Sequence, residues 1–435
     1  MDALPPPVLI ALPYAIHALF IFALGACVGS FINVVAIRLP MGMGLVQPPS
    51  RCPVCGRRLR WSENIPVLGW FLVRGRCRSC GTCVSPAYAA VELLMGALFA
   101  GLYLLLFAVE PSGPWGGTWP QWFQATGFMG SVPALLALYA LIAALVAATL
   151  SDVRTYLIPI QVTAWPTAVG CAAWTLQSAF GPASAPAIAV WRERWPVPLP
   201  DWTMTGVAMG AAAGLLLSNI LLRTGRILPS FHDYHEHQSD DSPFADYPHA
   251  RREIWREIRF VLPALAGACA GALVARWIAS ATGTAGAAVP LPMAALAASV
   301  LGYLVGAGLV WIVRVLGTLI KGVEAMGMGD VHLMGAAGAV LGWVDPTIGF
   351  FVAPFIGLSW IAIAAVAGRM KGGGRREIPY GPHLAIAVLL IIFLRPVVLD
   401  AGRVLFPAWV AAQRENAPRG ASLAPDPPRL RSRRP

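Results

Sequence analysis

The chain has 435 residues, of which 57% are hydrophobic and only 12% are charged, and its mean hydropathy is +0.65. Soluble domains carry about 25% charged residues, so this composition excludes an ordinary soluble enzyme and indicates a polytopic membrane protein. The net charge is +11. Because the arginines concentrate in loops beside apolar runs, the charge indicates membrane topology and contact with anionic lipid, and we expect no nucleic-acid partner.

The first apolar run covers about residues 8–35, and no Lys or Arg precedes Arg38. A cleavable signal peptide would need a positively charged segment before its apolar core. We therefore expect residues 1–37 to form a retained first transmembrane helix with its N-terminus outside.

Later apolar runs long enough to cross a bilayer cover the ranges 87–109, 131–151, 158–178, 204–222, 260–280, 292–316, 347–368 and 382–398. The run 331–343 is too short for an upright span, although it could complete a hairpin with 347–368. We expect an all-α polytopic membrane protein of about 8–10 transmembrane helices, ten if the short run is counted.

Loop charge predicts the orientation of these helices. The loop 38–86 contains eight arginines and one acidic residue, which places it in the cytoplasm, whereas 110–130 contains no basic residue and is expected outside. Continued alternation places 223–259 and 369–382 inside as well. Asp152 and Asp330 should then both emerge at the cytoplasmic face, while the Pro- and Arg-rich tail is expected to be disordered and outside.

The two aspartates end or follow apolar runs, where an ionisable group is costly and by default functional. Asp152 closes the run 134–150, and Asp330 follows Gly327-Met328-Gly329. Two carboxylates brought close together would share one proton, so that one could activate water while the other protonates a carbonyl. Taken singly, each aspartate has a simpler interpretation: Asp152 as a helix-end acid paired with Arg154, and Asp330 as a helix N-cap after two glycines.

Five cysteines crowd into the basic loop 38–86. Cys52-Pro-Val-Cys55-Gly and Cys77-Arg-Ser-Cys80-Gly are two C-x-x-C-G knuckles, and together they provide four thiolates for a structural Zn²⁺ ion. A reducing cytoplasm argues against disulfides. Cys83 leaves an alternative open because Cys80-Gly-Thr-Cys83 is also C-x-x-C; the glycine after the second thiol favours Cys77 and Cys80.

These motifs together resemble the type IV prepilin peptidases, which are membrane aspartic proteases that remove leader peptides from prepilins and pseudopilins. Besides the knuckles, the similar stretches are 29–40, 63–70, 91–94, 152–159, 327–333 and 378–382. The resemblance implies that Asp152 and Asp330 are the catalytic pair, at the cytoplasmic face of the inner (cytoplasmic) membrane. It also implies N-methylation of the new N-terminus with S-adenosylmethionine, for which the sequence identifies no binding residues.

The chain departs from the family pattern in two places. Ile160 stands where relatives commonly have an acidic residue, and 179–290 is expected to be an insert with two extra spans, an even number that leaves the side of Asp330 unchanged. Within this insert, His232, His235, His237 and His249 lie among acidic residues; a solvated loop is favoured over a metal site there.

The predicted organisation is a first transmembrane helix (1–37), a cytoplasmic zinc-binding loop with four cysteine ligands (38–86), transmembrane helices with the first aspartate (87–178), the insert (179–290), the peptidase core with GxGD (291–398) and the tail (399–435). Glu92 is a further polar candidate, and packing or a lipid-interface position would equally explain it. Two other functions remain open: a proton-coupled transporter, which needs carboxylates along a path through the bilayer, and a non-catalytic assembly platform that uses the zinc loop.

Overall fold

In the computed structural model, the described residues are 6–110, 113, 117–180, 195–231, 249–283, 287–366 and 379–405. They are almost entirely helical, and their only bridges between extended segments are two isolated pairs in the cysteine loop, Arg51 with Arg58 and Arg76 with Cys83. The chain divides into two units, Met1–Phe393 and Leu394–Pro435. Every site described below lies in the first unit.

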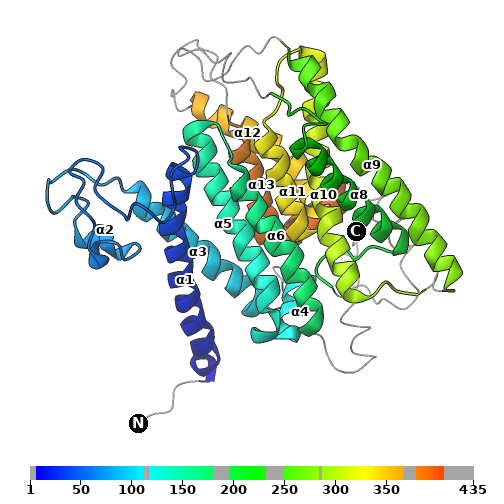
Figure 1. Cartoon of the computed structure of the whole chain (residues 1–435). Helices are drawn as coiled ribbons and strands as arrows, with labels where there is room; N and C mark the ends of the chain where they lie inside the picture. Colours follow the sequence, from blue (N-terminus) through cyan, green and yellow to red (C-terminus); the bar gives the residue numbers. More distant parts are fainter. Residues whose placement is uncertain are drawn as a thin grey trace, which may run out of the picture. The chain divides into compact units, whose positions relative to one another are not determined.

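Figure 1 shows the order of the helices along the chain. They are α1 (Pro6–Arg38), α2 (Leu68–Leu72), α3 (Ala87–Phe107), α4 (Thr118–Thr126), α5 (Val132–Thr155), α6 (Ile160–Gln177), α8 (Trp202–Arg223), α9 (Ala250–Ala281), α10 (Leu291–Lys321), α11 (Met328–Leu341), α12 (Val344–Val366) and α13 (Gly381–Leu405). Short 3₁₀ turns occupy Trp61–Glu63, Met129–Ser131 and Ser178–Phe180.

Eight helices in the described part of the chain are long and apolar enough to cross a membrane, which confirms the all-α polytopic class. They are α1, α3, α5, α8, α9, α10, α12 and α13. The predicted span 158–178 forms α6, but its glutamines and threonines keep its mean hydropathy below that of the eight. The run 331–343 lies in α11, which has 14 residues and is also too short.

The short helix α11 is nevertheless the most enclosed element of the core. All of its residues from Val331 to Leu341 except His332 are buried, packed among α5, α6 and α10. Its contact with α10 depends on Gly302 and Gly338: a Cβ added to either glycine would lie 2.0 Å or less from the carbonyl oxygen of the other. Such small residues let membrane helices approach closely, and Trp174 of α6 donates to the Val340 carbonyl at 2.9 Å.

The predicted insert contains the helix pair α8 and α9, so both of its expected extra spans are present as helices. Their contact is again made by glycines, with Gly206 and Gly210 of α8 against Gly271 and Gly267 of α9, and an added Cβ would lie 2.0–2.3 Å from the opposite carbonyl oxygen. The pair packs against α10, which leads directly into α11. The insert is therefore in contact with α10, the helix that precedes the Asp330-bearing helix in the chain.

Candidate functional site

Asp152 lies in the last turn of α5, where the backbone geometry is well defined. Tyr156 adopts the left-handed conformation with φ of 54° and donates its N–H to the Asp152 carbonyl at 2.9 Å, and the Ser151 hydroxyl donates to the Leu157 carbonyl at 2.7 Å. The helix thus ends without exposing Asp152, which stays buried. The Asp152 carboxylate accepts the N–H of Gly381 at 3.1 Å, so its partner among the described residues is this distant amide and not Arg154.

Asp330 lies in the first turn of α11. Gly327 is the N-cap of this helix, and the Asp330 N–H donates to the Gly327 carbonyl at 3.2 Å. The simpler interpretation of Asp330 as an N-cap is therefore wrong, because the aspartate is the third helical residue. Gly329 permits this position, since a Cβ there would lie 2.7 Å from Cβ of Ile158.

The two carboxylates meet at Gly381, the first residue of α13. A Cβ built on Gly381 would lie 2.7 Å from Oδ2 of Asp152 and 3.2 Å from Oδ1 of Asp330. One methyl-sized position therefore borders both side chains, which come from helices far apart in the sequence. Gly381 is a site residue that sequence reasoning did not single out, although the stretch 378–382 contains it.

Both aspartates are 7% exposed, and Oδ1 of Asp330 has no hydrogen-bond partner among the described residues. A buried oxygen without a partner is uncommon in proteins and demands an explanation. Here the unpartnered oxygen is the one that lies 3.2 Å from the position of a Cβ on Gly381, and Asp152 Oδ2 lies 2.7 Å from the same position. A proton held between the two acids, or a polar group of a substrate, would satisfy it.

The predicted zinc ligands also come together. The thiol sulfurs of Cys52, Cys55, Cys77 and Cys80 all lie within 4.8 Å of one another, with 3.8 Å from Cys52 to Cys80 and 3.9 Å from Cys55 to Cys77. A tetrahedral zinc ion with Zn–S bonds of about 2.3 Å requires sulfurs about 3.8 Å apart, so the four thiols fit the metal. Cys83 lies outside this group and is exposed.

The two knuckles have the same local structure. In the first knuckle, the Cys52 N–H donates to the Arg57 carbonyl and the Gly56 N–H donates to the Cys52 carbonyl. In the second knuckle, the Cys77 N–H donates to the Thr82 carbonyl and the Gly81 N–H donates to the Cys77 carbonyl. Gly56 and Gly81 have φ of 69° and 71°, a conformation that glycine adopts without strain. This explains why a glycine follows the second cysteine of each motif.

The surroundings of the thiols shift their pKa values in both directions. The backbone N–H of Cys55 lowers the pKa of Cys52, and the N–H of Cys80 lowers the pKa of Cys77 to about 6. The N–H of Thr82 also lowers the pKa of Cys80, but burial and hydrogen bonds with the other three thiols outweigh it and raise the value to about 11. Four adjacent thiols cannot all ionise without a compensating positive charge, which a bound Zn²⁺ would supply.

Glu63 joins the knuckles to each other. Its buried carboxylate accepts Arg57 Nη2 at 2.8 Å and lies 3.6 Å from Arg78 Nε, so it is linked to one arginine from each knuckle. The backbone N–H of Arg60, followed by the charge and hydrogen bonds of Arg57, lowers the pKa of Glu63. Arg57 and Arg78 are therefore paired within the loop.

Glu92 joins the loop to the membrane helices. Its carboxylate on α3 accepts the N–H of Val67 at 2.6 Å, and Val67 has an unusual φ of 63°. This role differs from both earlier interpretations, because Glu92 binds the loop backbone directly. The signal was the carboxylate inside an apolar helix, but the sequence could not identify its partner.

The remaining predicted features have these outcomes. Residues 232–248, with most of the histidine- and aspartate-rich loop, and 406–435, with most of the tail, lie outside the described residues. Ile160, at the position where relatives commonly have an acidic residue, is the first residue of α6 and is exposed.

An all-helical membrane protein with two buried carboxylates at one point and a four-thiol metal group has the features expected of a membrane aspartic peptidase. Comparison with known proteins agrees with this class: residues 23–106 match the Bacterial Peptidase A24 N-terminal domain. A prepilin leader peptidase/N-methyltransferase of Myxococcus xanthus is 55% identical over 84 residues, which cover 19% of this chain and 25% of that protein.

Other relatives carry the same kind of name. A prepilin leader peptidase/N-methyltransferase of Burkholderia pseudomallei is 36% identical over 178 residues, covering 35% of this chain and 50% of that protein. A type 4 prepilin-like proteins leader peptide-processing enzyme of Escherichia coli is 35% identical over 109 residues, covering 21% and 39%. The chain thus spans half or less of the length of these relatives, and no solved structure matches it. The resemblance to the type IV prepilin peptidase family is confirmed.

Proposed function

We propose that this protein is a membrane aspartic endopeptidase that cleaves the leader peptides of type IV prepilin-like or type II secretion pseudopilin precursors. The observation that carries the proposal is the meeting of Asp152 and Asp330 at Gly381. The printed names of the relatives support the substrate class. The enzyme resides in the inner membrane, with its active site at the cytoplasmic face where the basic loops lie.

The chemistry follows from the geometry of the pair. One ionised carboxylate removes a proton from water while the protonated partner donates to the scissile carbonyl oxygen, so no covalent intermediate forms. The Gly381 N–H, at the N-terminus of α13, fixes the orientation of the Asp152 carboxylate. The apolar N-terminal segment of a prepilin would enter laterally from the bilayer and bring the cleavage point to these groups.

The cysteine loop would hold a structural zinc ion through Cys52, Cys55, Cys77 and Cys80. A closed set of four thiolates leaves no coordination position for substrate, so the metal would stabilise the loop and would not take part in hydrolysis. The names of the relatives also support N-methylation with S-adenosylmethionine.

The alternative functions fit the geometry less well. A proton-coupled transporter requires carboxylates at successive depths, whereas Asp152 and Asp330 border the same position. A non-catalytic assembly platform requires neither carboxylate for its activity.

The test is cleavage of a prepilin-like substrate by membranes that contain the wild type, Asp152→Asn or Asp330→Asn. Each asparagine keeps the size of the side chain and removes the titratable group, so we expect both variants to lose at least about 1,000-fold in rate. Asp201→Asn is the matched control, because Asp201 caps α8 by accepting the Met204 N–H, and asparagine caps equally well. If either dyad variant cleaves at the wild-type rate while correctly inserted, the proposed function is wrong.

A further inference from the structure

A buried arginine lies on α10, a helix that is otherwise almost entirely apolar. Arg314 is only 1% exposed, and its nearest sequence neighbours are Val313 and Val315. A guanidinium in such surroundings is strongly unfavourable unless its charge is paired and its donors are satisfied. The groups that satisfy Arg314 therefore indicate its purpose.

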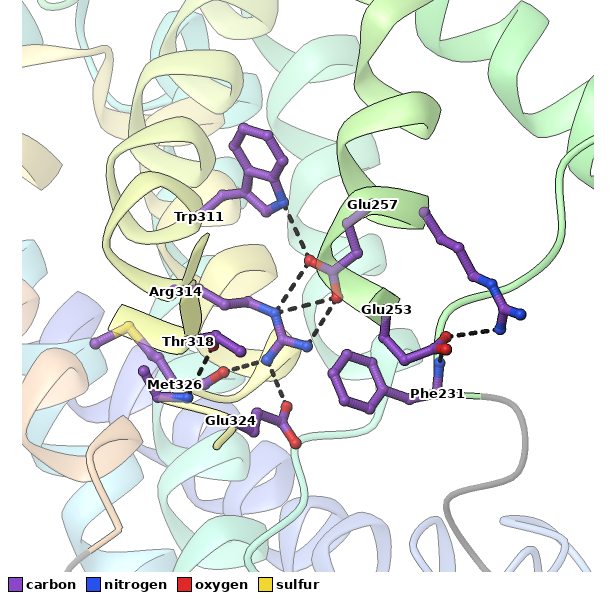
Figure 2. A network of polar contacts seen from close by, with 10 residues as sticks. Phe231, Glu253, Glu257, Trp311, Arg314, Thr318, Glu324 and Met326 are labelled. Atoms are coloured by element: carbon purple, nitrogen blue, oxygen red, sulfur yellow. Dashed lines mark hydrogen bonds and ion pairs between the residues drawn. The ribbon is translucent and has the colours of Figure 1, made fainter. Parts of the chain in front are cut away.

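One side of the guanidinium is held by α9, as Figure 2 shows. Arg314 Nη2 donates to Glu257 Oε1 at 2.8 Å and Nε donates to Oε2 at 3.2 Å, an arrangement with two parallel bonds. Glu257 is also buried and accepts Trp311 Nε1 at 3.2 Å. Both oxygens of the Glu257 carboxylate thus accept hydrogen bonds from side chains of α10.

The other side of the guanidinium holds the loop between α10 and α11 (Figure 2). Arg314 Nη1 donates to the backbone carbonyl of Met326 and to the carboxylate of Glu324. Thr318 adds a third anchor, because its hydroxyl accepts the Ala325 N–H at 3.1 Å. The residues immediately before the GxGD motif are therefore fixed to α10.

This anchor lies next to the aspartate in the chain. Met326 directly precedes Gly327, which caps α11 and accepts the N–H of Asp330. If Arg314 moved, the Met326 carbonyl that it holds could move with it, and Asp330 is only four positions after Met326 in the chain.

We infer that Glu257 and Arg314 are a positioning pair through which α9 holds the GxGD loop, and hence Asp330, in place. The inference rests on the proposed function. It gives a role at the active site to a helix of the predicted insert. Stability alone does not require this pair, because apolar residues of similar volume often replace a buried ion pair without loss.

The same helix provides a matched control. Glu253, one turn before Glu257, is also fully buried and also bonds to arginines, but these are Arg252 and Arg256 of its own helix. It further accepts the N–H of Phe231 at 3.1 Å. Glu253→Gln therefore repeats the chemistry of Glu257→Gln at a carboxylate that has no hydrogen bond or ion pair with Arg314 or with the GxGD loop. Its link to Arg314 is indirect, through Phe231, whose ring centroid lies 5.3 Å from the guanidinium carbon of Arg314.

The first experiment measures prepilin-like substrate cleavage by the full-length protein in membranes. We expect Glu257→Gln to lower kcat about 10- to 100-fold with KM nearly unchanged, because small displacements of a reacting group have effects of this size. Glu253→Gln should keep a kcat within about twofold of wild type, as expected where no reacting group is displaced. The double variant Arg314→Leu/Glu257→Leu should insert and fold, because two leucines put an apolar contact in place of the ion pair. Its kcat should nevertheless stay as low as that of Glu257→Gln.

The outcomes separate positioning from packing. If Glu257→Gln and Glu253→Gln have equal kcat, or if the double variant regains wild-type kcat, the pair is merely structural and the inference is wrong. A second measurement does not depend on activity: trypsin cleavage after Lys321, which is exposed at the end of α10, should be faster in Glu257→Gln than in Glu253→Gln. Equal cleavage at Lys321 would also contradict the inference, whereas absent activity in the wild type would contradict only the proposed function.

Discussion

The carboxylate pair and the cysteine cluster are assembled in opposite ways. Each half of the cysteine cluster is a short knuckle closed by its own backbone hydrogen bonds, and the halves are linked within one loop by Glu63. The carboxylate pair has no local structure of this kind: Asp152 is held by an amide 229 positions away, and Asp330 is presented by a buried helix. The cysteine cluster is thus a local structure, whereas the carboxylate pair is assembled by the packing of the whole helix bundle.

This difference predicts how each region responds to change. A local site tolerates distant substitutions and fails when one of its own residues is lost. A site assembled from separated helix ends is sensitive to any substitution that shifts those ends, even one that removes no reactive group. Three substitutions test the comparison, in decreasing order of expected effect on cleavage.

The largest effect is expected for Gly381→Ala. The added methyl would lie 2.7 Å from Asp152 Oδ2 and 2.9 Å from Ile158 Cδ1, so the carboxylates must move apart. We expect cleavage to fall about 100-fold although both aspartates remain. Gly308→Ala on α10 is the control, because its Cβ would meet nothing within 4 Å. Equal cleavage rates for the two variants would show that cleavage does not depend on the absence of a side chain at Gly381.

An intermediate effect is expected for Cys77→Ser. Loss of one thiolate should abolish stoichiometric zinc binding, measured by metal analysis of the purified protein. Cleavage should fall only about two- to tenfold, because a metal held by four thiolates would be structural. Cys83→Ser should retain one zinc ion per chain, since Cys83 lies outside the cluster. Zinc loss in Cys83→Ser would instead assign the second knuckle to Cys80 and Cys83.

The smallest effect on cleavage is expected for Glu63→Gln, which leaves all four thiols in place. The neutral side chain weakens the link to Arg57 and Arg78, so the rate of zinc transfer to a chelator should rise about tenfold, as is usual for groups that support metal ligands. Cleavage before chelation should match wild type. Unchanged zinc transfer would show that the knuckles hold each other without Glu63.

Much of the site could be predicted from the sequence, for reasons that differ between residues. The spacing of the two C-x-x-C-G motifs favoured the four cysteines that the structure brings together and explains the glycine after each motif, because each knuckle depends on a few adjacent residues. Loop charge and apolar runs predict membrane helices because the bilayer acts on each segment separately. The same local logic offered an N-cap as the simpler alternative for Asp330, and this alternative is wrong because Gly327 is the N-cap.

The tertiary structure alone decided which distant groups meet. Packing between elements remote in the chain brings Gly381 next to both carboxylates. It also makes Glu92 the acceptor of the Val67 N–H and Glu257 the partner of Arg314. Composition and periodicity identify a costly charge in an apolar segment, because the cost is a property of that segment. They cannot name the partner that offsets it, since hydrogen bonds and ion pairs act over a few ångströms, and only the packed bundle brings those atoms within that distance.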